Sequence, residues 1–197
     1  MAMKHLADIE KSRKEYLALP NIKWRKDYFD ETTDGFVATH ILKEKDNLHR
    51  TGIVAEVNAC FELAKTGKHV LRLPENVPAL INTISIDGRS YCELLKYKLG
   101  NNNPRGYPDA YFDAQTWDFK TSTYNNVETI RQLIKDGRKA NNVIFIMTDI
   151  QQINMIQNAI DREVGNRLRD NSWILLPDVF YLIDGKLSAL WKKKKGR

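Results

Sequence analysis

The uninterrupted apolar run Val143–Met147 is the feature that most constrains the fold. A run with no polar residue at alternate positions is typical of a strand that is buried on both faces of a sheet. Amphipathic patterns before and after it predict helices over 126–140 and 150–169. A buried strand between two such helices favours an α/β arrangement over an all-helical or all-strand one.

The remaining patterns extend this arrangement in both directions. Helices are expected over 3–18, 51–66 and 91–99, and strands over 36–42, 69–73, 109–113, 116–122, 179–183 and 186–191. Asn125 is the expected N-cap of the helix that carries Glu128 three residues on, and Asp184-Gly185 is the expected turn of a C-terminal hairpin. We therefore predict an α/β fold with a mixed sheet flanked by helices. In it, residues 1–48 form an accessory N-terminal helix and strand, 49–191 the main domain, and 192–197 a basic tail.

Composition excludes several classes of protein and decides little else. The chain has a net charge of +6, but its basic excess lies mostly in the tail, so the charge alone is weak evidence for a nucleic-acid partner. Cys60 and Cys92 are too few for a disulfide framework or a Cys-based zinc site. No stretch approaches the roughly 18 apolar residues that span a bilayer, and Met1–Leu19 is too charged for a signal-peptide core. We expect a cytoplasmic protein that has no membrane partner.

Glu56 is the first residue that indicates chemistry. On the expected helix over 51–66, helical spacing places it between Ile53 and Cys60, on the packed side. A carboxylate in that position must be paired, neutralised or bound to a cation, because burying its bare charge costs several kcal/mol. The alternative is a glutamate at the edge of the apolar stripe whose carboxylate reaches solvent.

A second group follows at Asp109, Asp118 and Lys120. Side chains alternate along a strand, so Trp117 and Phe119 take one face while Asp118 and Lys120 share the other. Asp109 reaches that same surface if the hairpin brings the two strands into register. Two carboxylates held close together favour a divalent cation between them, and Mg²⁺ prefers oxygen ligands. An ordinary salt bridge between Asp118 and Lys120 is the alternative.

These residues, in this order, resemble the motif of the PD-(D/E)xK nuclease superfamily: Glu56 on a helix, then Pro108-Asp109, then Asp118-Phe-Lys120 on the next strand. More narrowly, the chain is similar to the C-terminal tRNase domains of contact-dependent growth-inhibition (CdiA-type) toxins. That similarity lies in Ala55-Glu-Val-Asn-Ala59, Leu63-Ala64, Gly67, Pro108-Asp109 and Trp117-Asp-Phe-Lys120. Related domains occur in phage and mobile-element proteins. The resemblance covers about half of the chain, and the connection over 74–107 is longer than a compact core of this kind requires.

The resemblance implies a restriction-endonuclease-like fold, with a core of helix, three antiparallel strands, helix and strand, and it makes 49–191 the nuclease domain. By position, Asp109 and Asp118 would bind Mg²⁺ or Mn²⁺. Glu56 would be a third acid that binds the metal directly or through water, and Lys120 the catalytic base or a stabiliser of charge.

The implied function is endonuclease activity on RNA, with tRNA the favoured substrate, in the bacterial cytoplasm. DNA is the alternative substrate, and a non-catalytic nucleic-acid-binding or phage accessory module is the alternative class. If the chain is a toxin that is delivered into a cell, an immunity protein is its implied partner. Four basic residues of the 126–140 helix either follow a phosphate backbone or form a solvated face: Arg131, Lys135, Arg138 and Lys139.

Overall fold

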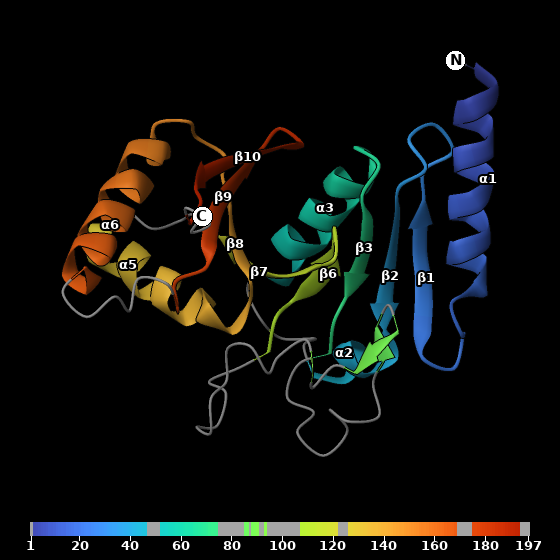
Figure 1. Ribbon diagram of the computed structural model, residues 1–197, viewed down its shortest axis with the longest axis horizontal. Coiled ribbons are helices and arrows are strands. Elements are labelled where there is room, and N and C mark those ends of the chain that lie inside the picture. Colours follow the sequence, from blue (N-terminus) through green and yellow to red (C-terminus); the bar gives the residue numbers. More distant parts are fainter. Residues whose placement is uncertain are drawn as a thin grey trace.

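One eight-stranded sheet carries the fold, in the strand order β1-β2-β3-β6-β7-β8-β9-β10 (Figure 1). The computed structural model describes residues 2–46, 52–74, 85–86, 88–90, 93, 107–121, 126–168 and 175–193. The strands of the sheet are Trp24–Phe29 (β1), Phe36–His40 (β2), His69–Arg72 (β3), Ala110–Phe112 (β6), Gln115–Thr121 (β7), Asn142–Ile146 (β8), Asp178–Ile183 (β9) and Lys186–Trp191 (β10). A separate small hairpin pairs Ser85–Ile86 (β4) with Arg89–Ser90 (β5).

The sheet is mixed. Antiparallel pairs join β1 to β2, β3 to β6, β6 to β7 and β9 to β10. Parallel pairs join β2 to β3, β7 to β8 and β8 to β9. The parallel pairs that flank β8 need crossover connections, and helices supply both of them.

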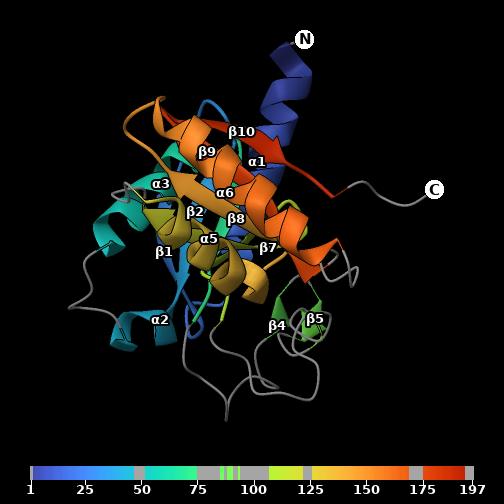
Figure 2. The same cartoon turned by 90° about the vertical axis from the view of Figure 1, so that its left-hand side faces the viewer.

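Helices cover both faces of the sheet. They are Ala2–Ala18 (α1), Ile41–Asp46 (α2), Ile53–Ala64 (α3), Val127–Asp136 (α5) and Gln152–Arg167 (α6), with a 3₁₀ turn at Gly137–Lys139 (η2) directly after α5. Figure 1 shows α5 and α6 at one end of the sheet and α1 beside β1 at the other, and Figure 2 shows α5 and α6 in front of β8. No helix in the described part of the chain is long and apolar enough to cross a membrane.

Alternation along β8 identifies the two faces. Ile144 packs in a core cluster with Cys60 and Leu63 of α3, whereas Val143 and Phe145 pack in a cluster with the apolar sides of α5 and α6. Because successive side chains of a strand point to opposite faces, α3 covers one face and the α5–α6 pair covers the other. The run of apolar residues in β8 is thus buried on both sides, as its sequence predicts.

The accessory N-terminal segment contributes to the same sheet as the main domain. Its strand β2 is paired in parallel with β3, and β1 forms the edge. The turn between β1 and β2 lies against the end of α3, where the Thr33 hydroxyl donates to the Ala64 carbonyl at 3.1 Å. A Cβ on Gly35 would lie 1.9 Å from that carbonyl oxygen, so only glycine permits this close approach.

Most of the predicted elements are present, and the differences have local causes. The mixed α/β sheet with flanking helices and the C-terminal hairpin are confirmed. The strand β1 was not predicted, because Arg25, Lys26 and Asp27 interrupt its apolar pattern at the sheet edge. The N-cap of α5 is Asn126 rather than Asn125: its side chain accepts from the Glu128 amide at 2.8 Å. The helix predicted over 91–99, apart from Glu93, and the tail from 194 onwards lie outside the described residues.

Candidate active site

The β6–β7 hairpin brings the predicted Asp109, Asp118 and Lys120 together. Ala110 pairs with Trp117, so Asp109, one residue earlier on β6, lies beside Asp118, one residue later on β7. Trp117 and Phe119 face α3 in the core, which turns Asp118 and Lys120 to the opposite face. The predicted alternation along this strand is therefore confirmed, and so is the register that it required.

The backbone around Asp109 fixes the orientation of its side chain. The Asp109 amide donates to the Trp117 carbonyl at 2.9 Å, and its carbonyl accepts from the Leu73 amide at 2.8 Å. Its Oδ2 then accepts from the Phe119 amide at 2.7 Å. The Asp109 carboxylate thus replaces a main-chain acceptor where the β6–β7 ladder ends. This hydrogen bond keeps the carboxylate next to Asp118.

Two ammonium groups contact the buried Asp118 carboxylate. Lys120 Nζ lies 2.8 Å from Asp118 Oδ2, and Lys139 Nζ lies 2.7 Å from Asp118 Oδ1 and 3.6 Å from Asp109 Oδ1. Asp118 is fully buried, yet within the described residues neither of its oxygens accepts a hydrogen bond of good geometry. Both contacts are ion pairs, one on each oxygen of the carboxylate.

The close approach of η2 explains how Lys139 reaches the two aspartates. A Cβ added to Gly137 would lie 2.0 Å from Val143 Cγ2 and 3.5 Å from Asp118 Oδ2. Glycine therefore lets the turn after α5 lie directly on β7 and β8. Lys139, two residues later, extends from this turn to the carboxylates.

Glu56 lies near this group without contacting the aspartates. It belongs to α3, on the face of the sheet opposite Asp118. Its Oε1 forms ion pairs with Lys43 Nζ at 3.0 Å and with Arg72 Nη2 at 3.1 Å. Lys43 Nζ also lies 3.4 Å from the Asp109 carbonyl oxygen, so this one ammonium joins Glu56 to Asp109. Of the two alternatives for Glu56, the paired carboxylate is the observed one, with its side chain 14% exposed.

The ion pairs continue into the N-terminal strands. Arg72 Nη1 donates to the Thr39 hydroxyl at 3.2 Å, and that hydroxyl donates to Asp27 Oδ2 at 2.5 Å. Asp27 lies on β1 and Thr39 on β2. Residues of the accessory segment therefore support the groups that hold Glu56.

Burial and neighbouring charges separate the carboxyl groups in their acidity. Burial, together with the charge of Asp109, raises the pKa of Asp118 from 3.8 to about 7. Burial also raises the pKa of Glu56, with the ammonium of Lys43 opposing it. Although burial disfavours its charge, the ammonium groups of Lys139 and Lys43 and the Phe119 amide hold the pKa of Asp109 below its usual value.

The aspartate pair suits a divalent cation better than Glu56 does. Asp109 and Asp118 present oxygen ligands at one point, and burial together with the charge of Asp109 raises the pKa of Asp118 although two ammonium groups contact it. Glu56 already forms ion pairs with the Lys43 ammonium and the Arg72 guanidinium. Within the described residues, no three acidic, His or Cys side chains form a group that could hold a metal ion. A metal role for Glu56 therefore stays a prediction, while Asp109 and Asp118 fit the role.

The four basic residues predicted as a stripe have different partners within the fold. Arg131 and Lys135 face α6, where Glu163 lies 3.2 Å and 3.6 Å from them. Arg138 donates to the Lys135 carbonyl at 2.9 Å, and Lys139 belongs to the aspartate group. These are contacts within the chain, and a role of the four residues at a phosphate backbone stays a prediction.

Two members of the site were missed by sequence reasoning. Lys43 belongs to α2, a short helix with no distinctive pattern, so nothing in the sequence indicates its role. Arg72 had a usable signal, because a charged residue that directly follows Val70 and Leu71 in the central strand β3 needs a partner when it is buried. That partner is Glu56.

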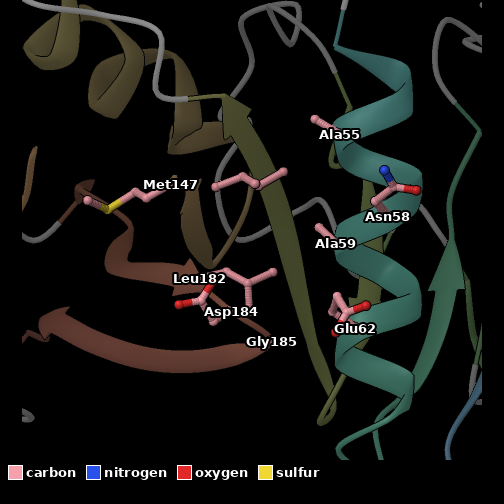
Figure 3. A pocket seen from close by; sticks show the side chains of 9 residues that line it. Ala55, Asn58, Ala59, Glu62, Met147, Leu182, Asp184 and Gly185 are labelled. Carbon is pink, nitrogen blue, oxygen red and sulfur yellow. The ribbon is translucent and has the colours of Figure 1, made fainter. Parts of the chain in front are cut away.

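A cavity of about 300 Å³ lies beside α3 (Figure 3). It is lined by α3, the end of β8 and the β9–β10 turn, through Ala55, Asn58, Ala59, Glu62, Ile146, Met147, Leu182, Asp184 and Gly185. None of the predicted catalytic residues lines it. The candidate site is therefore a compact charged cluster rather than this cavity.

Comparison of the chain with known protein families, with curated proteins and with solved structures found no match.

Proposed function

We propose that the chain is a metal-dependent endonuclease of the PD-(D/E)xK type, acting on RNA with tRNA as the favoured substrate. The observation that carries the proposal is the convergence of Asp109, Asp118 and Lys120, three residues chosen from the sequence, at one buried point of the sheet. The order and pairing of α3, β3, β6, β7, α5 and β8 also agree with the core that the resemblance implies.

In this proposal, Asp109 and Asp118 hold a Mg²⁺ or Mn²⁺ ion. Such an ion polarises a phosphoryl oxygen and lowers the pKa of an attacking water. The Phe119 amide orients Asp109, and burial keeps bulk water from competing for Asp118. Both effects fix the ligands before substrate binds.

Lys120 supplies positive charge beside the scissile phosphate. Its Nζ lies 2.8 Å from Asp118 Oδ2, and its side chain is 15% exposed. There it stabilises the negative charge that develops on the phosphoryl oxygens. Lys43 and Arg72 act as positioning residues, since they hold Glu56 and support Asp109 from the opposite face.

The test is to incubate purified protein with total tRNA and with plasmid DNA, in Mg²⁺ or in EDTA. We expect cleavage of RNA in Mg²⁺ only, and its loss in Asp118→Asn. Asp113→Asn is the matched control, because Asp113 is an exposed acid of the same hairpin that pairs with Lys68. Cleavage that persists in EDTA excludes the mechanism. Cleavage of plasmid DNA alone reassigns the substrate to DNA.

A second candidate, a non-catalytic nucleic-acid-binding or phage accessory module, is favoured by one observation. All three acids already have basic partners, so the cluster can serve the fold without a metal. Binding of RNA or DNA without cleavage, unchanged in Asp118→Asn, would support this candidate.

The biological context follows from the resemblance alone. If the chain is a toxin, its site of action is the bacterial cytoplasm and its partner an immunity protein. Poor transformation by the wild-type gene, relieved by Lys120→Ala, would support this context.

A further inference from the structure

The two lysines that contact Asp109 differ in how firmly they are held. The Lys43 side chain is 3% exposed, and its ammonium lies between Glu56 Oε1 and the Asp109 carbonyl. The Lys139 side chain is 18% exposed, and its ammonium lies between Asp109 Oδ1 and Asp118 Oδ1. Lys43 is enclosed by protein, whereas part of the Lys139 side chain is exposed.

Lys139 stands where a divalent cation would bind. Mg²⁺ binds carboxylate oxygens at about 2.0–2.1 Å, and Asp109 and Asp118 would hold such an ion. The Lys139 ammonium is 2.7 Å from one of these oxygens and 3.6 Å from the other. Two cations cannot occupy this small space, because their repulsion is strong in a buried setting.

Lys139 can leave this position without rearrangement of the fold. Its backbone belongs to η2, which Gly137 holds against Val143 and which the Ala140 amide closes on the Gly137 carbonyl at 3.0 Å. The lysine side chain is a flexible four-carbon stem with a strongly hydrated ammonium. It can rotate into water while the turn stays in place. Lys43 has no such route, since nearly all of its side chain is covered.

We propose that Lys139 is a built-in competitor for the metal: a divalent cation that binds Asp109 and Asp118 exchanges with the Lys139 ammonium, whereas Lys43 stays in place. The inference rests on the proposed function, because it assumes that this aspartate pair binds the metal. It adds that the affinity for the metal is set by competition with a residue of the chain itself. It also limits the site to one ion, because Lys43 already occupies the position between Glu56 and Asp109.

The experiment is a titration of the full chain with Mn²⁺, followed by electron paramagnetic resonance of the free ion, in the absence of nucleic acid. The variants are Lys139→Met and Lys135→Met. Lys135→Met is the matched control. It removes the same charge from the same helix–turn unit, but Lys135 pairs with Glu163, outside the site. We expect one Mn²⁺ per wild-type chain, about tenfold tighter binding in Lys139→Met, and less than about a twofold change in Lys135→Met.

The outcomes separate this inference from the proposed function. Equal affinity in all three proteins, with wild-type cleavage intact, would overturn the exchange and leave the nuclease proposal standing. Two ions per wild-type chain would overturn the limit set by Lys43. Equal tightening in both variants would show a general effect of charge and also overturn the exchange. No Mn²⁺ bound by any of the proteins would remove the metal site, and both proposals with it.

Discussion

Replacing Asp118 by Asn is expected to make the protein more stable at neutral and alkaline pH while it abolishes the proposed activity. The carboxylate is fully buried beside Asp109, and its pKa is raised from 3.8 to about 7. A raised pKa in the folded state means that folding favours the protonated acid. Asn has nearly the same shape as that acid and carries no charge to bury.

The magnitude follows from the displacement of the pKa. Each tenfold change in proton affinity corresponds to about 1.4 kcal/mol, so a rise from 3.8 to about 7 corresponds to roughly 4 kcal/mol. Relaxation of the surroundings reduces the effect, and we expect a gain of about 2 to 4 kcal/mol. Loss of the ion pairs with Lys120 and Lys139 subtracts little, because both side chains are partly exposed and Lys139 keeps Asp109 as a partner.

The dependence on pH has a definite sign. Between pH 4 and 7 the folded protein binds more protons at Asp118 than the unfolded chain does, so the stability of the wild type falls as the pH rises through this range. The Asp118→Asn variant lacks this pH-dependent loss of stability. The difference in the free energy of unfolding should be near zero below pH 4, grow between pH 4 and 7, and stay constant above pH 7.

Urea denaturation of both proteins from pH 4 to 9, in EDTA, measures this difference directly. A variant that is less stable than the wild type at pH 8 would refute the reasoning, because the two ammonium groups would then outweigh the burial of the charge. Added Mg²⁺ should stabilise the wild type and not the variant, since only the wild type binds the ion in the proposed mechanism.

Three further predictions concern other parts of the molecule. Lys120→Met should lower metal-dependent RNA cleavage by roughly a hundredfold or more, and cleavage at the wild-type rate would remove Lys120 from the mechanism. Gly35→Ala should destabilise the protein by about 2 to 4 kcal/mol in urea denaturation, because its Cβ would overlap the Ala64 carbonyl. Gly165→Ala is the control: its Cβ would meet nothing within 4 Å on the exposed side of α6, so the free energy of unfolding should rise by about 0.5 to 1 kcal/mol. Asp30→Asn should cost about 1 kcal/mol at pH 7 through weaker hydrogen bonds to its turn, which hold the pKa of Asp30 well below its usual value. That contribution is fully present above pH 4 and is lost progressively as the pH falls toward the lowered pKa, so a cost that does not shrink between pH 7 and pH 2 would contradict it.

The sequence by itself determined the local elements and the residue types of the candidate site. The apolar run of β8 required burial on both faces, and the alternation in β7 separated Trp117 and Phe119 from Asp118 and Lys120. These features depend on periods of a few residues, which a single sequence shows directly. Asp184-Gly185 likewise defined its hairpin turn, in which both residues have positive φ.

Only the tertiary structure decided which charges meet. Lys43, Arg72 and Glu56 lie on three separate elements, and no local pattern says that α2 would carry an ammonium between Glu56 and Asp109. The structure also moved Lys139 from an expected surface stripe to the aspartate pair, because Gly137 lets η2 lie on β7 and β8. The physical reason is that buried charges must find partners wherever the packed chain supplies them, and those partners are set by the docking of elements far apart in sequence.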